Sequence, residues 1–268
     1  MDGPVSPGRV HTAMILAAGL GTRLKPWTDR HPKALALVNG KSLLQHNVMY
    51  LQRFGIRRVV VNVHHFADQV IKVLKDNNGW GSEIIISDES HEVLETGGGL
   101  VKAAPFLQAA PFVLMNVDIL TDLELNQLIE DHVKTGALAT LATSQRKTSR
   151  YLLFNGKNNL TGWRNTKTGE QKTADMKGSP SGELIEKAFS GIHVINPIIF
   201  SLITRTGKFS MIDVYLDLMQ QHTIKSFDHT GCRFIDVGKP ESIQQAEQLF
   251  TPGILKKHAN STNSTSKT

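Results

Sequence analysis

The sequence predicts an α/β fold with a doubly wound, mixed but mainly parallel sheet and a smaller α+β lobe. Between residues 12 and 145, short aliphatic runs alternate with segments whose apolar residues recur at helical spacing. After Ser144 the chain changes to short apolar runs separated by turn residues, which is typical of hairpins. Repeated strand–helix units build doubly wound sheets and place ligands at the carboxyl ends of the strands.

The first part of the chain supplies the parallel strands. Each predicted strand is a short aliphatic run bounded by turn residues, as buried parallel strands are. These runs are Met14–Ala17, Val59–Val63, Ile84–Ser87, Phe112–Met115 and Ala137–Thr143. Helical spacing predicts three helices, at Ser42–Phe54, Phe66–Asp76 and Leu123–Val133. Ser42 can cap the first helix at its start, and Gly55 can end it.

The second part mixes hairpins with helices. Tyr151–Phe154 and Leu160–Trp163 flank Asn155-Gly156, which predicts a hairpin. The polar stretch 165–183 is expected to be a flexible excursion. The later elements are a strand at Ala188–Ile195, a helix at Met211–Gln220, a strand at Arg233–Asp236 and a helix at Glu241–Phe250. We therefore expect an N-terminal extension at 1–11, a core at 12–145, a second lobe at 146–250 and a disordered tail at 251–268.

Composition, cysteine count and net charge exclude several classes of protein. The 268 residues are 40% hydrophobic and 20% charged, as in an ordinary soluble globular protein. Cys232 is the single cysteine, so an internal disulfide is excluded, and neither a secretory leader nor a membrane-length apolar run is present. We therefore expect a cytoplasmic protein that binds no membrane. The net charge of +6 favours anionic partners. However, the Lys and Arg residues are scattered and form no basic patch interleaved with aromatic residues, so we expect no nucleic-acid binding.

The stretch from Leu16 to Lys33 predicts a polyphosphate site. Ala18–Gly21 has almost no side-chain bulk and follows a predicted buried strand, so backbone N–H groups can approach a phosphate closely. Arg23 and Lys33 add two cations. No Gly-Lys-Ser/Thr follows, which excludes a Walker A loop, and Leu24 stands where a dinucleotide fingerprint has its third glycine. The pattern therefore points to nucleotide chemistry of another kind.

Two aspartates are candidate metal ligands. Asp118 ends the apolar run that starts at Phe112, and Asp236 ends the run Arg233–Ile235 before a glycine. Taken singly, each could be a helix cap or a turn residue. Together, beside a phosphate loop, they fit Mg²⁺, which takes one or two protein carboxylates plus phosphate oxygens.

The run Glu95-Thr96-Gly97-Gly98-Gly99 follows the third predicted strand. Consecutive glycines cost backbone entropy, so they indicate close ligand approach or a sharp turn into the next helix. A flat base lying on this backbone is one interpretation, and a plain flexible loop is the alternative. His64-His65 lacks a third ligand at metal spacing, so we expect hydrogen-bonding or surface histidines there.

These residues resemble the sugar-1-phosphate nucleotidylyltransferases. The resemblance rests on Leu16–Arg23, Pro32-Lys33, Asp118 and Asp236, and it runs from Thr12 to Phe250. Leu94–Gly99 and Phe189–Val194 most resemble the short bacterial uridylyltransferases that act on N-acetylmuramate 1-phosphate. The sequence departs from the family at Val117, where a glycine is usual. The resemblance implies a nucleotide-diphospho-sugar transferase fold, with nucleotide in the core and sugar in the second lobe.

The resemblance also implies roles for single residues. Arg23 and Lys33 would be catalytic, Asp118 and Asp236 would bind Mg²⁺, and Asn116 and Gly191 would contact the sugar. The implied nucleotide-binding residues are Ala17, Ala18, Gly19, Leu20, Gly21, Thr22, Arg23, Glu95, Gly97 and Gly98.

The implied reaction joins a nucleoside triphosphate to a sugar 1-phosphate and releases pyrophosphate. UTP and N-acetylmuramate 1-phosphate are the expected substrates. The alternatives are a mannose- or heptose-1-phosphate guanylyltransferase and a non-catalytic subunit that senses nucleotide sugars. A monomer or a homodimer is expected.

Overall fold

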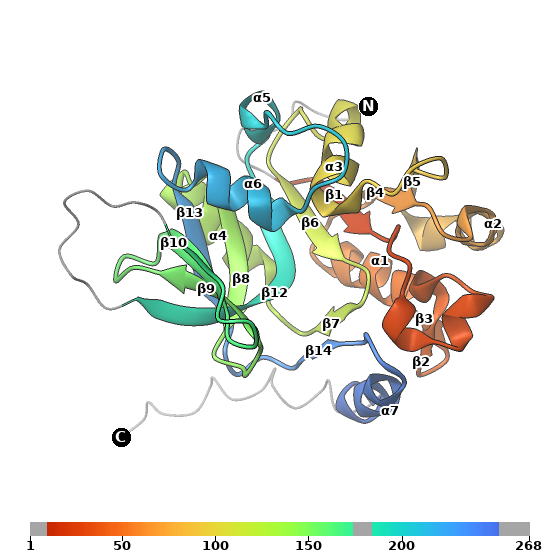
Figure 1. The fold of residues 1–268 in the computed structure, drawn as a ribbon. Coiled ribbons are helices and arrows are strands. Elements are labelled where there is room, and N and C mark those ends of the chain that lie inside the picture. The colour runs from red at the N-terminus through yellow and green to blue at the C-terminus, as the bar shows by residue number, and fades with distance from the viewer. Residues whose placement is uncertain (1–9, 174–183, 252–268) are drawn as a thin grey trace, which may run out of the picture.

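A ten-stranded mixed sheet forms the centre of the molecule (Figure 1). The computed structural model describes residues 10–173 and 184–251. The main path of the sheet runs β11-β10-β9-β12-β6-β1-β4-β5, and β8 and β13 are attached through β12. Most of the predicted extension and tail, and the part of the predicted excursion at 174–183, lie outside the described residues.

Four neighbouring strands of the predicted core are parallel. They are β1 (Thr12–Leu16), β4 (Arg58–Val63), β5 (Glu83–Asp88) and β6 (Phe112–Asn116). β1 lies between β4 and β6, with Leu16 opposite both Asn62 and Asn116. Because all four strands run the same way, their carboxyl ends meet at one edge of the sheet, where loops can bring functional groups together.

β12 (Ile185–Ile195) joins the two halves of the chain. It runs antiparallel to β6, and it also pairs with β8 (Ala139–Ser144) and β9 (Arg150–Phe154). The remaining strands are β10 (Leu160–Asn165), β11 (Gln171–Thr173) and β13 (Ile224–Asp228). The expected smaller lobe therefore continues the sheet of the core. The predicted hairpin is present as β9–β10, and part of the expected excursion is β11, paired with β10.

Helices cover both faces of the sheet. On one face lie α1 (Leu43–Arg53), α2 (Ala67–Asp76), α4 (Leu125–Thr135) and α7 (Pro240–Leu249). On the other lie α3 (Glu95–Lys102), α5 (Ile199–Leu202) and α6 (Met211–Leu218). β1 alternates between the two cores: Ala13 and Ile15 belong to the first, and Met14 and Leu16 to the second. The mixed, doubly wound fold is confirmed.

Local sequence explains where the helices begin. Ser42 accepts a hydrogen bond from the backbone N–H of Gln45 at 3.1 Å, which confirms its predicted capping role. Ser210 caps α6 and forms a reciprocal capping box with Asp213. Within the described part of the chain, no helix is both long and apolar enough to cross a membrane.

Two small sheets complete the fold. β2 (Leu37–Val38) pairs with β3 (Lys41–Ser42), and β7 (Ile119–Thr121) pairs with β14 (Phe234–Asp236). The β7–β14 pair matters for function, because it brings residues 234–236 back beside the segment that follows β6.

Candidate active site

The loop after β1 turns sharply at Gly21. This residue has φ +63°, and a Cβ built on it would lie 2.9 Å from both Lys33 Cβ and Thr28 Cγ2. Thr28 Oγ1 also donates a hydrogen bond to the Gly21 carbonyl oxygen at 3.0 Å. Glycine is therefore required both for the backbone conformation and for the close approach of the segment that carries Lys33.

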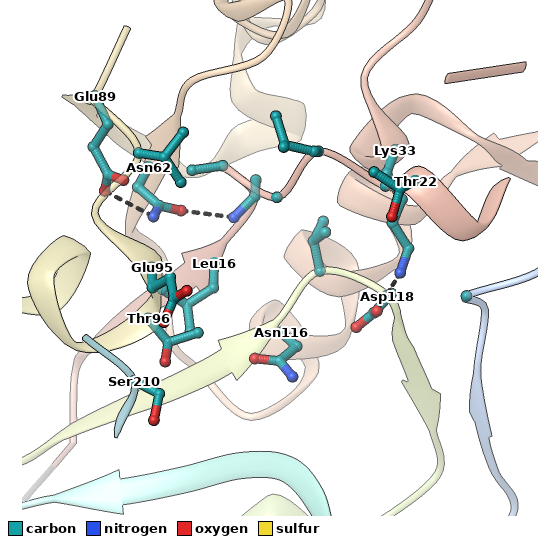
Figure 2. Close-up of a pocket in the computed structure, with 18 of the residues that line it drawn as sticks. Leu16, Thr22, Lys33, Asn62, Glu89, Glu95, Thr96, Asn116, Asp118 and Ser210 are labelled. Carbon is teal, nitrogen blue, oxygen red and sulfur yellow. Dashed lines mark hydrogen bonds and ion pairs between the residues drawn. The ribbon is translucent and has the colours of Figure 1, made fainter. Parts of the chain in front are cut away.

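A cavity of about 490 Å³ opens at the carboxyl ends of β1 and β6. Figure 2 shows side chains from both halves of the chain directed around it. Its lining includes most of the predicted site residues, namely Ala17, Ala18, Gly19, Leu20, Gly21, Thr22, Arg23, Lys33, Glu95, Asn116 and Asp118. The predicted nucleotide loop and the first predicted metal ligand therefore share one cavity.

Lys33 and Asp118 form an ion pair at the floor of the cavity (Figure 2). Their side chains are 10% and 16% exposed, so water screens the pair weakly. Lys33 lies in the 3₁₀ turn Lys33–Leu35, while Asp118 lies between β6 and β7. The pair thus joins the long loop after β1 to the end of β6.

Asp236 lies beside Asp118 through backbone pairing. The Val237 N–H donates to the Asp118 carbonyl oxygen at 2.8 Å, and Asp236 stands opposite Ile119 in the β7–β14 pair. Burial, followed by the negative charge of Asp118, raises the pKa of Asp236. Arg23 Nη2 lies 3.7 Å from Asp236 Oδ2. Two neighbouring carboxylates that repel each other suit a divalent cation.

The donor set suits Mg²⁺ in particular. Among residues 10–173 and 184–251, His, Cys, Asp and Glu side chains form no cluster of three or more that could hold a metal. A site for zinc normally has three or four protein ligands, whereas Mg²⁺ uses one or two carboxylates and completes its shell with water and phosphate oxygens. Asp118 and Asp236 beside a phosphate-type loop match the second case.

Comparison with known proteins places the chain in a family. Residues 12–252 match the nucleotidyl transferase family. The chain belongs to that family. An N-acetylmuramate alpha-1-phosphate uridylyltransferase from Neisseria meningitidis is 30% identical over 239 residues, covering 88% of this chain and 97% of the relative. A mannose-1-phosphate guanylyltransferase catalytic subunit beta from Drosophila melanogaster is 29% identical, covering 97% of this chain and 68% of the relative.

Solved structures agree with this assignment. HddC from Yersinia pseudotuberculosis, crystallised in complex with GMP-PN, has a TM-score of 0.71 and 25% sequence identity; the match covers 90% of this chain and 100% of HddC. The resemblance to sugar-1-phosphate nucleotidylyltransferases that the sequence predicted is thus confirmed, both for the fold and for the enzyme class.

The glycine run of this nucleotidyltransferase serves packing. Gly97 and Gly98 lie inside α3 and are not among the residues that line the cavity, so the contact of a base with their backbone stays a prediction. A Cβ at Gly97 would lie 2.4 Å from the Phe209 ring, and one at Gly98 would lie 2.3 Å from the Gly207 carbonyl oxygen. Their lack of side chains therefore lets residues 207–209 pack directly on α3. Glu95 and Thr96, at the start of α3, do line the cavity.

Residues 207–211 bring the second half of the chain to the cavity. Lys208 and Ser210 line it, and Lys208 Nζ lies 3.6 Å from Glu95 Oε1. Thr96 Oγ1 accepts a hydrogen bond from the Met211 N–H at 2.8 Å. Sequence reasoning missed this segment, because nothing in its local pattern reveals that it packs on α3.

Sequence reasoning also missed a polar pair at the back of the cavity. Asn62 lies within the second predicted strand and Glu89 follows the third, and both line the cavity (Figure 2). Asn62 Nδ2 donates to Glu89 Oε1 at 2.8 Å, while Glu89 Oε2 is buried with no hydrogen-bond partner in the described structure. Polar residues inside or just after aliphatic runs were the available clue.

The two predicted sugar-contacting residues touch each other. Asn116 lines the cavity. Gly191 (φ +70°) lies against the Asn116 side chain, since a Cβ on Gly191 would lie 2.8 Å from Asn116 Nδ2. Gly191 therefore leaves room for the Asn116 amide. It is not among the residues that line the cavity, and its contact with the sugar stays a prediction. The histidines are hydrogen-bonded, as expected: His64 Nδ1 lies 2.6 Å from the Glu89 carbonyl oxygen and His65 Nε2 lies 3.3 Å from that of Thr28.

Proposed function

We propose that this chain transfers a uridylyl group from UTP to N-acetylmuramate 1-phosphate and releases pyrophosphate. The main support is that Asp118, the cations Arg23 and Lys33 and a bare backbone loop line one cavity, and that Asp236 lies 3.7 Å from Arg23. The Neisseria meningitidis relative, which is named for this activity, aligns along 97% of its length. Lys33, Arg23 and both aspartates are all present, which supports an active enzyme over a sensing subunit without activity.

The reaction requires no protein nucleophile. An oxygen of the sugar phosphate attacks the α-phosphorus of UTP, a new P–O bond forms, and the bond between the α-phosphorus and the bridging oxygen breaks. Pyrophosphate leaves with the electron pair of that bond. Because the attacking group is already anionic at neutral pH, catalysis consists of positioning and charge stabilisation.

Residues of this chain would supply both effects. Backbone N–H groups of Ala18–Gly21 would hold the triphosphate, and Lys33 and Arg23 would offset the negative charge at the α-phosphate and the departing pyrophosphate. Glu95 and Thr96, at the opposite wall, would bound the base and ribose.

Asp118 and Asp236 would hold Mg²⁺ between them. When bound, the ion would neutralise part of the negative charge of the phosphates. Lys33 is already paired with Asp118 and would keep that carboxylate oriented, while Arg23 would do the same for Asp236 from 3.7 Å.

A guanylyltransferase acting on mannose or heptose 1-phosphate is the second candidate. It is favoured by the relative from Drosophila melanogaster, at 29% identity along 97% of this chain, and by the likeness to HddC in complex with GMP-PN.

The proposal is tested by a pyrophosphate-release screen. Four nucleoside triphosphates (UTP, GTP, CTP and dTTP) are each combined with the 1-phosphates of N-acetylmuramate, N-acetylglucosamine, glucose, mannose and heptose, in the presence of Mg²⁺. We expect the highest kcat/KM for UTP with N-acetylmuramate 1-phosphate. A preference for GTP with mannose or heptose 1-phosphate establishes the second candidate. Binding of nucleotide without turnover of any pair establishes a sensing subunit.

A further inference from the structure

A second compartment opens from the active-site cavity toward the antiparallel half of the sheet. It has a volume of about 270 Å³ and shares Leu16, Thr96 and Asn116 with the main cavity. Its outer wall carries two arginines, Arg146 and Arg150, together with Trp163. Since the main cavity holds the nucleotide loop, this compartment is the space for the acceptor.

Arg146 is a partly buried residue whose guanidinium lines this compartment. Its Nη2 donates to the Phe189 carbonyl oxygen at 2.6 Å, and its Cζ lies 5.0 Å from the centroid of the Phe234 ring. Its Nε is buried with no hydrogen-bond partner in the described structure. Phe234 precedes Asp236 on β14, so the guanidinium is fixed next to the proposed metal site.

The charge of Asp236 offsets part of the cost of burying the Arg146 guanidinium, but the two side chains form no ion pair. Among residues 10–173 and 184–251, neither Arg146 nor Arg150 forms an ion pair. Removing a cation from water is costly unless an anion compensates. A guanidinium that lines a cavity and is held there by a carbonyl and an aromatic ring is a ready receptor for a phosphate.

Arg150 lies at the outer end of the same compartment. It is the first residue of β9, on the same face of the strand as Leu152, and the register pairs Leu152 with Trp163 on β10. Arg150, Leu152 and Trp163 therefore share one face, and all three line the compartment. Trp163 offers a flat apolar surface for a sugar ring, and the exposed Arg150 lies beyond it.

We propose that this compartment selects an acceptor with two separate anionic groups, Arg146 binding its phosphate and Arg150 binding a carboxylate on its sugar. The inference rests on the proposed function and deepens it. N-acetylmuramate 1-phosphate carries both groups, because a lactyl ether places a carboxylate on its ring. N-acetylglucosamine 1-phosphate is the same molecule without that ether, so it offers the phosphate alone.

The pair of acceptors gives a direct test. The kcat/KM of each is measured with UTP for the wild type, Arg150→Gln and Arg146→Gln; where turnover of N-acetylglucosamine 1-phosphate is slow, its Ki against N-acetylmuramate 1-phosphate replaces kcat/KM. Lys147→Gln is the matched control, since Lys147 is exposed in the same segment and does not line the compartment.

Arg150→Gln is expected to lower the preference for N-acetylmuramate 1-phosphate over N-acetylglucosamine 1-phosphate by about tenfold or more, the usual worth of a charge-assisted hydrogen bond. Arg146→Gln is expected to weaken both acceptors alike, and Lys147→Gln neither. Equal losses for both acceptors in Arg150→Gln, or an unchanged preference, overturn the inference while leaving the proposed function standing. A wild type that does not use N-acetylmuramate 1-phosphate overturns both.

Discussion

The side-chain oxygen of Asn62 accepts a hydrogen bond from the backbone N–H of Ala17 at 2.6 Å. Asn62 lies on β4 and Ala17 is the first residue of the loop after β1, so the bond fixes where that loop leaves the sheet. The Asn62 amide nitrogen meanwhile holds Glu89. One buried side chain thus joins the proposed phosphate loop to the segment after β5.

Asn62→Ala tests this connection. Loss of the side chain leaves the Ala17 N–H and the Glu89 carboxylate without these partners, so we expect the free energy of unfolding to fall by about 1–3 kcal/mol. We also expect KM for UTP to rise about tenfold, because the loop proposed to hold the triphosphate is no longer fixed. Steady-state kinetics below the unfolding transition measure this. Asn77→Ala, at the exposed asparagine that follows α2, is the control, and an unchanged KM in Asn62→Ala contradicts the expectation.

Glu89→Gln tests the cost of burying a carboxylate. Burial raises the pKa of Glu89 above its usual value, so the folded state holds the proton more tightly than the unfolded state does. Stability contributed by this group is therefore present at low pH and lost as pH rises through the folded pKa. Glutamine can still accept the Asn62 hydrogen bond and carries no charge.

We expect the glutamine variant to be more stable than the wild type at pH 8 by about 1 kcal/mol, and equally stable near pH 4.5. Urea unfolding at both pH values measures the difference. A variant that is equally stable or less stable at pH 8 shows that the Glu89 carboxylate is compensated in the folded state.

Gly98→Ala tests the packing of α3 on residues 207–209. The added Cβ would lie 2.3 Å from the Gly207 carbonyl oxygen, and backbone cannot move aside as a flexible side chain can. We expect a loss of about 1–3 kcal/mol in the free energy of unfolding. Gly156→Ala, where a Cβ meets nothing within 4 Å, is the matched control in thermal unfolding. Equal melting temperatures for the two variants exclude the close packing.

The sequence predicted the parallel strands and the phosphate-type loop because both depend on local pattern. β1, β4, β5 and β6 are aliphatic runs bounded by turns, and the loop is recognisable from small residues followed by cations. Asp118 and Asp236 were singled out because each ends an apolar run. Their proximity depends on the pairing of β7 with β14, across more than a hundred residues, which no local pattern encodes.

The remaining features depend on tertiary contacts. The three glycines of α3 indicated close approach correctly, but the approaching groups belong to the protein itself. Gly97 and Gly98 face the segment 207–209, and Gly99 faces the Glu89 and Asn62 side chains, which only the fold reveals. Arg146 gave no sequence clue either, since a single arginine after a strand is common on protein surfaces. Arg146 packs against the Phe234 ring because the pairing of β14 with β7 brings Phe234 to this edge of the sheet.

The most direct test of the account is the rate of pyrophosphate release from UTP and N-acetylmuramate 1-phosphate by the wild type, Lys33→Ala, Asp118→Asn and Asp236→Asn. We expect each variant to fold, by circular dichroism, and to be slower by about 100-fold or more, as when a group that stabilises transition-state charge is removed. A rate near that of the wild type in either aspartate variant contradicts the assignment of these two carboxylates to one magnesium ion.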